Sequence, residues 1–561
     1  MQLLKKATDP SFWQSVREKD CFEAYRQEVL SMWENTCADK PIPSLRYSDF
    51  KQFILTGDRD SYETPYFARR HALDASALLS LIYPENEEYV NRLMDEIFAI
   101  CDEYTWCVPA HHGAVDIENP YRIDLFAAET GFALAEIYTM LEDRLEPLIK
   151  SRIKTEINRR IITPFCSADR YGSWENGTSN WTAVCVGSVA CTCMLMRPEI
   201  VSSLKPRFDR AMEFYLCGFE DDGICTEGCG YWHYGFGFFV VYADMIKTFT
   251  KGETDYFKRE KVKTIATFIQ KMFLSENACV SFADGHPTLR YHLGLVHYLK
   301  GIYPDDIVVY DRKYSYNYDH CGRFCLQLRS AIWYSEAYES ANTPKEDVTY
   351  YGEDAQWFVH KTASYGFAAK GGHNEENHNH NDIGSFIFAK DGVQILTDPG
   401  PAKYTRQYFA AGERYTFFHS ASRGHSVPII DGNYQKTGIE YKAKNSRAEN
   451  GVFTTDIAGA YGLDELVSLT RRFDCQKDSV TVSDTFLYTG KGALTERIVC
   501  AFKPEQKADG ILSVHHSEIV YDKEKVASVA ISRFTFDGKP DCFTVDFLLK
   551  EDARTFSFTV K

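Results

Sequence analysis

Residues 377–400 read NHNHNDIGSFIFAKDGVQILTDPG, and this stretch decides the fold of the second half of the chain. Its central part, residues 383–397, is an apolar run, an Asp391-Gly392 pair and a second apolar run. An Asp-Gly pair between two apolar runs is typical of a β-hairpin. We therefore predict two antiparallel strands joined by a tight turn and entered by a polar run of histidine, asparagine and aspartate.

The polar run before the hairpin has the residue types of a ligand-binding site. If it is extended, His378, His380 and Asp382 share one face, because side chains alternate along a strand. Two histidines and a carboxylate on one face are a potential metal-ligand set, and burying all three without partners would be costly. The alternative is a polar loop in which each histidine binds a backbone carbonyl, and both interpretations stay open at this point.

The composition is that of an acidic globular protein. At 561 residues the chain exceeds the usual size of a single core, so two or more domains are expected. Hydrophobic residues make up 44% and charged residues 25%, while the aromatic content of 14% is high and suits a protein that stacks on sugar rings. The net charge of −16 argues against nucleic acid as a partner, because phosphate binding needs a basic surface.

No apolar run reaches membrane-spanning length, and residues 1–20 lack the order of a secretion signal. We expect a cytoplasmic protein without a membrane partner, or a periplasmic or secreted one if a signal was removed; a homo-oligomer is left open. The 17 cysteines are odd in number and scattered, which favours reduced thiols over disulfides. The pairs Cys191/Cys193 and Cys225/Cys229 are interpreted as apolar packing rather than as metal ligands.

The chain changes character near residue 320. Before it, apolar residues recur at helical spacing. The helical stretches are 66–83, 86–103, 124–141, 146–162, 179–196, 231–251 and 258–274. After it, short runs rich in Val, Thr, Phe and Ile are separated by turn signals such as Asp537-Gly538. We predict an α+β multidomain protein, with stacked helix pairs over 1–320 that close into an (α/α) toroid and an antiparallel β-sandwich over 321–561.

One candidate binding site lies at the start of a predicted helix. Residues 174–181, WENGTSNW, form a turn that leads into the helix, with Thr178 or Ser179 as N-cap. Free backbone N–H groups and the positive end of the helix dipole favour an anionic group there, and Asn180 can donate to a carboxylate beside them. Simple capping with a buried tryptophan is an equally good interpretation of this segment alone.

A second candidate is aromatic. Tyr231, Trp232, His233 and Tyr234 follow one another after the glycine-rich turn of DDGICTEGCGYWHYG, residues 221–235. They form either a platform for a sugar ring with a phenol acid/base, or the packed start of a helix. Composition alone favours packing.

Four segments occur in a fixed order: WENGTSNW, DGICTEGCGYWHYG, HNHNDIGSFIFAKDGVQILTDPGPAKY and RGHSVPIIDG. In that order the chain resembles the heparinase II/III-like polysaccharide lyases over most of its length. The block at 378–431, with HxHxD, the DPG turn and GHSVxxxDG, is the most specific part of the resemblance. The resemblance implies an (α/α) toroid followed by antiparallel β-sandwiches, and cleavage of uronic-acid polysaccharides by β-elimination to 4,5-unsaturated products.

The resemblance also implies a metal and a histidine in the cleft. His380, Asp398 and His425 match positions that hold a structural metal in zinc-containing relatives, and the set suits Zn²⁺. His378 matches a histidine that faces the cleft.

The catalytic groups follow from the same resemblance. Tyr234, or failing it Tyr231, falls in the segment that supplies the catalytic tyrosine, and Asn180 matches the asparagine that neutralises the substrate carboxylate. Trp181 stands where several relatives have a histidine base, so more of the catalysis falls on tyrosine and His378. The candidate contacts to substrate are Trp181, Trp232, His233, His111, Glu175 and Tyr404. The candidates for a basic wall are Arg69, Arg70, Arg159 and Arg160.

Two other functions stay open beside a lyase acting on an anionic uronate oligosaccharide or polysaccharide. A glycoside hydrolase on an (α/α) toroid would use paired carboxylates, with Glu175 and either Glu227 or Asp222, but would leave the histidine block unexplained. A non-catalytic sugar-binding protein would use the metal only to staple the sandwich. The near-ultraviolet absorbance of a conjugated unsaturated uronate separates the lyase from both. No motif distinguishes glycosaminoglycan-like from alginate-like substrates.

Overall fold

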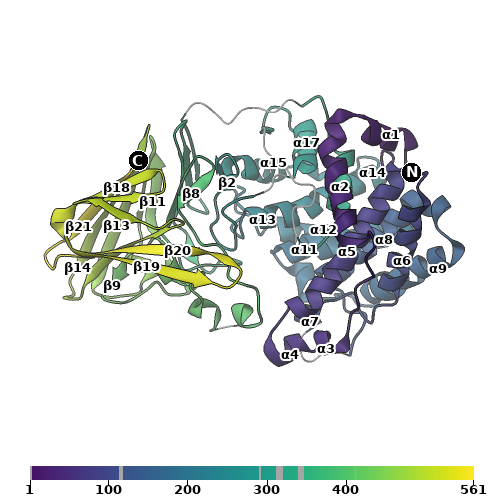
Figure 1. The fold of residues 1–561 in the computed structure, drawn as a ribbon, viewed down its shortest axis with the longest axis horizontal. Helices are drawn as coiled ribbons and strands as arrows, with labels where there is room; N and C mark the ends of the chain where they lie inside the picture. Colours follow the sequence, from purple (N-terminus) through teal and green to yellow (C-terminus); the bar gives the residue numbers. More distant parts are fainter. Residues whose placement is uncertain (1–2, 113–117, 290–291, 311–319, 339–346, 411) are drawn as a thin grey trace.

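The computed structural model describes residues 3–112, 118–289, 292–310, 320–338, 347–410 and 412–561. A helical part and a β part lie side by side along the long axis of the molecule, with the N-terminus in the first and the C-terminus in the second (Figure 1). The described helices of the first part precede residue 333, and the strands of the second follow residue 347. The predicted fold class, helical first and antiparallel β second, is therefore confirmed.

The longer helices are α2 (Glu23–Thr36), α5 (Asp60–Ile82), α6 (Glu87–Cys101), α8 (Leu125–Leu141), α9 (Pro147–Ile157), α11 (Asn180–Met196), α12 (Pro198–Leu216) and α14 (Gly237–Phe249). The shorter ones are α1 (Pro10–Glu18), α3 (Tyr47–Phe50), α4 (Gln52–Thr56), α7 (Pro109–His112), α10 (Thr163–Cys166), α13 (Cys229–Tyr231), α15 (Glu260–Ala266), α16 (Phe268–Met272), α17 (Leu293–Ile302) and α18 (Phe324–Ile332). Within the described part of the chain, no helix has the combined length and apolar character needed to cross a membrane.

Helix α11 lies at the centre of the helical part. It contacts α8, α12 and α14, and nearly all of its residues are buried. A helix that is apolar on every side is stable only when other helices surround it, which explains its sequence. Asn86 and Asp124 cap α6 and α8 by accepting backbone N–H groups, as their position before the predicted helices suggests.

The helical part ends later than the change in sequence character near residue 320. Helix α18 follows that point and packs against α17, α8 and α5, and the first strand of the large sheets begins at Val348.

The β part contains two large sheets in which every pairing of neighbouring strands is antiparallel. Sheet one has the order β19-β20-β15-β8-β7-β5-β4-β3, with β9 beside β15, and sheet two has the order β11-β12-β13-β14-β21-β18-β17-β16. The strands of sheet one are β3 (Val348–Gly352), β4 (Trp357–Lys361), β5 (Gly366–Lys370), β7 (Phe386–Lys390), β8 (Val393–Leu396), β9 (Ile429–Ile430), β15 (Leu494–Cys500), β19 (Val526–Phe536) and β20 (Lys539–Leu549). Those of sheet two are β11 (Lys444–Glu449), β12 (Val452–Asp456), β13 (Leu466–Gln476), β14 (Ser479–Tyr488), β16 (Glu505–Ala508), β17 (Ile511–Val514), β18 (Ser517–Tyr521) and β21 (Thr555–Val560). Two small pairings are β1 (Phe273–Ser275) with β2 (Ala278–Cys279), and β6 (His373–Asn374) with β10 (Gly438–Lys442).

Sheet one is the middle layer of the molecule. Phe358 packs against Phe453 and Phe367 against Phe473, both of sheet two, which makes the β part a sandwich. The opposite face of sheet one, with Trp357 and Ile387, belongs to the same core as the helices. Because β4, β5 and β7 are buried on both faces, their sequences are nearly continuous apolar runs rather than alternating ones.

The predicted hairpin is β7 and β8. Lys390 pairs with Val393, and the turn residues Asp391 and Gly392 have φ of 52° and 79°. Two positive φ angles fit the primed turn that an Asp-Gly pair favours, so this prediction is confirmed.

Candidate active site

A cluster of polar and aromatic side chains lies where the helical part meets the β part. The helical part contributes the start of α11, the loop before α13, α13 itself, and the loop that follows β2. The β part contributes residues 377–382 and the segment 401–414, which follows β8. The site therefore requires both halves of the chain.

The histidine run is not extended. His378 has a φ of 58°, so the alternation of side chains is broken at this residue. His378 Nδ1 lies 2.6 Å from Asp284 Oδ2, whereas Asp382 forms an ion pair of 2.7 Å with Lys370 Nζ. The prediction of an extended run with His378, His380 and Asp382 on one face was wrong: both histidines bind Asp284, but Asp382 pairs with Lys370.

Asp284 joins the parts of this cluster, although no motif in the sequence indicates it. It is 4% exposed and belongs to the loop after β2. Its carboxylate accepts hydrogen bonds from His378 Nδ1, His380 Nε2 (3.0 Å), the Tyr404 hydroxyl (2.9 Å), the Tyr408 hydroxyl (2.6 Å) and Arg414 Nη2 (3.0 Å). Burial acts to raise the pKa of Asp284, but the hydrogen bonds from the two histidines and the charge of Arg414 hold that pKa well below its usual range.

Tyr231 is the tyrosine that meets His378. Their rings stack with centroids 4.2 Å apart, and the Tyr231 hydroxyl oxygen lies 2.8 Å from that of Tyr404. Asp284 is ionised and only accepts, so Tyr404 donates to Asp284 and Tyr231 donates to Tyr404. The Tyr231 oxygen therefore keeps its lone pairs for another partner. Burial raises the pKa of Tyr231, which keeps the phenol protonated in this state.

Tyr234 lies in a different cluster. Its hydroxyl donates to Glu129 Oε1 at 2.5 Å, and the guanidinium of Arg323 lies 3.6 Å from the centre of its ring. Arg323 also pairs with Glu129. Of the two tyrosines considered from the sequence, the structure brings Tyr231 to His378 and does not bring Tyr234 there.

Asn180 begins α11 and faces a carboxylate of the chain itself. Its Nδ2 donates to Glu227 Oε2 at 2.6 Å and its backbone N donates to Glu227 Oε1 at 3.3 Å. Ser179 is the N-cap residue but makes no capping bond with its side chain. A small pocket that is open to solvent adjoins these groups. It is lined by Thr178, Asn180, Tyr215, Gly218, Phe219, Cys225, Thr226, Glu227, Tyr231 and Asn377.

Three predicted substrate contacts are internal. Trp232 is 0% exposed and donates to the carbonyl of Ile265, and His233 is buried, with its pKa lowered by burial to about 3. Glu175 is buried in an ion pair of 2.6 Å with Arg207. These side chains are buried and have no access to a ligand, so the prediction that they contact substrate was wrong.

His111 and Trp181 lie together at the edge of the helical part. Their rings are 4.7 Å apart, and His111 Nδ1 lies 2.7 Å from Asp124 Oδ2. Trp181 is only partly buried and directly follows Asn180, so both remain candidates for contact with a bound sugar.

The predicted basic wall is not a free surface. Arg69 and Arg70 pair with Glu103, and Arg159 and Arg160 pair with Glu156. Each carboxylate offsets one of the two positive charges that meet it, which helps to accommodate them where three of the four guanidinium groups are nearly buried.

The paired carboxylates of a hydrolase are not formed. Asp222 accepts backbone N–H groups from Ile224 and Ala355, and Glu175 is held by Arg207. The described contacts bring neither of them to Glu227.

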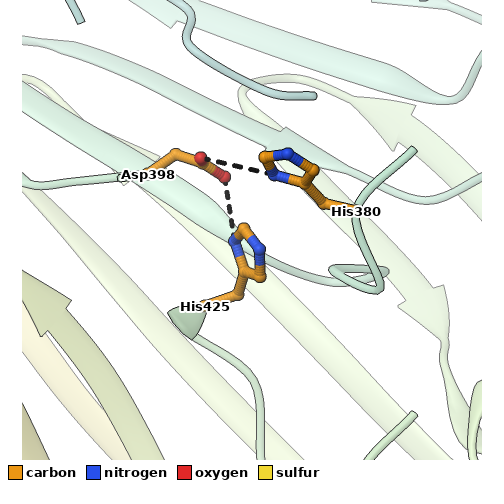
Figure 2. A group of neighbouring side chains, drawn as sticks. All are labelled: His380, Asp398 and His425. Atoms are coloured by element: carbon orange, nitrogen blue, oxygen red, sulfur yellow. Dashed lines mark hydrogen bonds and ion pairs between the residues drawn. The ribbon is translucent and has the colours of Figure 1, made fainter. Parts of the chain in front are cut away.

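His380, Asp398 and His425 form a compact, fully buried group (Figure 2). Each offers one ligand atom, and these atoms lie within 4.8 Å of one another. His425 Nδ1 is 3.0 Å from Asp398 Oδ2, and His380 Nδ1 is 4.0 Å from Asp398 Oδ1.

The second nitrogen of each histidine has a partner outside the group. His380 Nε2 binds Asp284 and His425 Nε2 binds the carbonyl of His419 at 2.8 Å. His380 Nδ1 has no hydrogen-bond partner although it is buried. In each histidine, one nitrogen is held by an acceptor and the other is directed at a carboxylate. This is the arrangement of an imidazole that binds a metal, so the donor set fits a divalent cation.

The comparisons with known proteins agree with this arrangement. Residues 351–540 match the family model of the heparinase II/III-like C-terminal domain, so the resemblance to the heparinase II/III-like family is confirmed for this region. No curated protein matches the chain.

Solved structures with the same fold come from glycosaminoglycan lyases. Heparan sulfate lyase HepC from Pedobacter heparinus aligns with a TM-score of 0.58 and 12% identity over 100% of this chain and 86% of its own. A heparinase III structure gives 0.58 and 13% over 100% and 93%. Chondroitin AC lyase from Streptomyces coelicolor A3, solved with chondroitin sulphate, gives 0.54 and 9% over 98% and 82%. The fold is therefore that of an (α/α) toroid followed by β-sandwich layers.

Proposed function

We propose that this chain is a lyase that cleaves uronic-acid-containing glycans by β-elimination. The observation that supports this most is the stacking of Tyr231 on His378, with Asn180 nearby, at the junction of the two halves. Lyases of known structure share the fold, and the family match covers the segment that includes His378.

The reaction requires a base, an acid and neutralisation of a carboxylate. The proton to be removed is on C5 of the uronate, next to its carboxylate, and the glycosidic oxygen on C4 leaves with a proton. Carbon beside an anionic carboxylate is a very weak acid, so groups that withdraw the carboxylate's charge lower the barrier in the way an oxyanion hole does.

Tyr231 is suited to the proton transfers. Its hydroxyl proton can pass to Tyr404 while the Tyr404 proton passes to Asp284, which leaves a Tyr231 phenolate to take the C5 proton. A phenol that has taken this proton can then protonate the leaving oxygen if both lie on one side of the sugar ring. Proton transfer by a positioned side chain typically contributes about 10²- to 10⁴-fold to the rate.

Asn180 and His378 are suited to the carboxylate. As an imidazolium, His378 donates from Nδ1 to Asp284 and holds a second N–H at Nε2, which lies 3.9 Å from Glu227 Oε2. The amide of Asn180 has a second N–H beyond the one that binds Glu227. Both groups therefore point to one place, where a uronate carboxylate would be bound.

We also propose that His380, Asp398 and His425 hold one Zn²⁺, which joins the turn after β8 to the segment after residue 419. The support is the buried donor set, the partnerless His380 Nδ1 and the outer hydrogen bonds of both histidines. When bound, the ion adds a cross-link to the β part, and its role is structural.

The proposed function is tested with a panel of uronate oligosaccharides, from glycosaminoglycan-like to alginate-like. Cleavage by the protein is expected to produce the near-ultraviolet absorbance of an unsaturated uronate on at least one of them. If chromatography shows that the oligosaccharides are shortened but no absorbance develops, the protein is a hydrolase instead.

A further inference from the structure

Glu227 is a buried carboxylate that the proton transfers above do not use. It is 7% exposed and belongs to the short loop before α13. Its two oxygens accept the side-chain and backbone N–H groups of Asn180, and His378 Nε2 is 3.9 Å away. Glu227 thus touches the same two groups that are proposed to receive the carboxylate of a substrate.

Two carboxylates cannot share this position while both are charged. A uronate bound by the second N–H of Asn180 and by His378 would lie next to the Glu227 carboxylate in a site largely shielded from water. Like charges at such a distance raise the pKa of one group strongly, so that the pair keeps one proton.

Resting on the proposed function, we propose that Glu227 meets the uronate as a carboxylic acid, so that the protein takes up one proton from solvent when a uronate binds at Asn180. The proton bonds to an oxygen of Glu227 and is donated to an oxygen of the uronate. No covalent bond of the substrate changes in this step. Because the product still has a carboxylate, the proton is returned to solvent when the product leaves.

The surroundings of Glu227 already raise its pKa before a substrate binds, which makes uptake of the proton easier. Burial raises the pKa of Glu227, and the nearby charge of Asp284 adds to this, while His378 and the hydrogen bonds from Asn180 lower the pKa. The titratable groups around it, element by element, are Tyr215 of α12, Cys225 in its own loop, Tyr231 of α13, Asp284 after β2, and Glu376 and His378 before β7. Of these groups, only His378 can carry a positive charge. A second anion bound here therefore adds mainly to the electrostatic repulsion of Glu227.

The arrangement also explains selection of a uronate over a neutral sugar. A carboxylic acid donates a strong, short hydrogen bond to a carboxylate, and a hydroxymethyl or ester group cannot replace that acceptor. Glu227 is therefore expected to determine specificity for the free acid, in addition to the neutralisation by Asn180 and His378.

The test is titration calorimetry of the Tyr231→Phe protein, which is expected to bind without cleaving. The probes are unsulfated tetrasaccharides of glucuronate with N-acetylglucosamine and of mannuronate. Titrations near neutral pH in two buffers with different ionisation enthalpies give the number of protons taken up. We expect about one proton per bound tetrasaccharide, and an affinity that falls about tenfold per pH unit above the pKa of Glu227.

Glu227→Gln in the same background keeps an N–H donor and an acceptor but cannot titrate. It is expected to bind the tetrasaccharide with no proton uptake and with an affinity independent of pH. Glu376→Gln is the matched control: Glu376 accepts a hydrogen bond from Thr226 next to Glu227, and this variant should still take up the proton.

The outcomes separate the two proposals. If the protein that retains Glu227 binds a tetrasaccharide without taking up a proton, Glu227 must move away from Asn180. This result would overturn the present inference alone. Proton uptake that survives in Glu227→Gln would also overturn it. If neither tetrasaccharide binds, the proposed function fails, and the inference fails with it.

Discussion

Tyr231 and Tyr234 are three residues apart in the sequence, yet they belong to two different clusters. The hydroxyl of Tyr231 reaches Tyr404 of the β part, whereas that of Tyr234 reaches Glu129 of α8. The family resemblance favoured Tyr234 over Tyr231, although both tyrosines follow the same glycine-rich turn. The structure favours Tyr231, since of the two tyrosines only Tyr231 has a described contact with the His378 ring.

We expect Tyr231→Phe to lower kcat at least about a hundredfold with the fold intact, because it removes the proton donor and acceptor but little volume. Tyr234→Phe is the matched control and should lower kcat far less, while reducing stability through loss of the bond to Glu129. Initial rates from product absorbance and melting temperatures measure the two effects. A larger loss of kcat in Tyr234→Phe would assign catalysis to the other cluster.

Asp284 orients His378 and Tyr404 and, through Tyr404, the hydroxyl of Tyr231. Asp284→Asn should lower kcat about tenfold or more, with a smaller change in KM, because it replaces one acceptor oxygen by an NH2 group and removes the charge that fixes the protons of His378 and Tyr404. Tyr408→Phe removes one donor to Asp284 but keeps the hydrogen bonds from Tyr404 and His378, so its effect on kcat should be small. Equal losses of kcat in the two variants would contradict the orienting role.

At the scale of elements, the turn after β8 joins the loop after β2. A Cβ at Gly400, where φ is 63°, would lie 2.3 Å from the carbonyl oxygen of Gly285, so only glycine permits this approach. Asp398 lies two residues before Gly400, and Asp284 lies one residue before Gly285. The contact between the two glycines therefore brings both aspartates to the same place. The proposed zinc ligands and the active-site hub are therefore built on one contact between loops.

We expect about one zinc per chain by elemental analysis of protein purified without added metal. Chelation, or Asp398→Ala, should lower the melting temperature, because an ion that binds only the folded protein stabilises it. The effect of chelation should be absent in Asp398→Ala, which serves as the control. A protein that is folded, active and free of metal would contradict this proposal.

Helix α17 gives the molecule a sensitivity to acid. His292 caps it by accepting from Leu295 N, at 3.0 Å, and burial lowers the pKa of His292 to about 4. The unfolded chain binds a proton at His292 below about pH 6.5, whereas the folded chain resists protonation down to about pH 4. Stability therefore falls as the pH drops through this window, by roughly 2 kcal/mol at about pH 5 for this one group.

His292→Asn should flatten this dependence, because asparagine caps a helix without titrating. Melting temperatures of the parent and the variant at neutral and mildly acidic pH provide the measurement. An equal decrease of the melting temperature in both would show that His292 is not the group responsible.

At the scale of the whole molecule, sheet one joins the two halves. Its apolar face packs into the helical core, and the active site draws on loops from both sides. Residues 1–338 and 347–561 produced separately should therefore each lack cleavage activity and aggregate more readily than the full chain, as gel filtration and product absorbance would measure. Activity of either piece alone would mean that the site does not lie at the junction.

The sequence allowed prediction of features encoded locally. The Asp391-Gly392 hairpin and the helix starts at Asn86, Asp124 and Asn180 follow from turn chemistry, capping and period. The order of helices before strands followed from the same patterns.

The sequence did not reveal features that depend on contacts between distant residues. Asp284 has no motif of its own, and its partners lie about a hundred residues further along the chain. The aromatic run was misinterpreted in part because consecutive residues of a helix point in directions about 100° apart, so Trp232 and His233 cannot share the face of Tyr231. Glu175 is paired with Arg207, which no local pattern indicates.

The central claim is that the chain breaks a glycosidic bond by elimination, without adding water. The most direct measurement is mass spectrometry of the products formed in water enriched in heavy oxygen, from an oligosaccharide that the protein cleaves. Elimination predicts two fragments whose masses add up to that of the parent, with no heavy oxygen in either and an unsaturated uronate at one new end. Fragments that together exceed the parent by one heavy water would show hydrolysis and contradict the account.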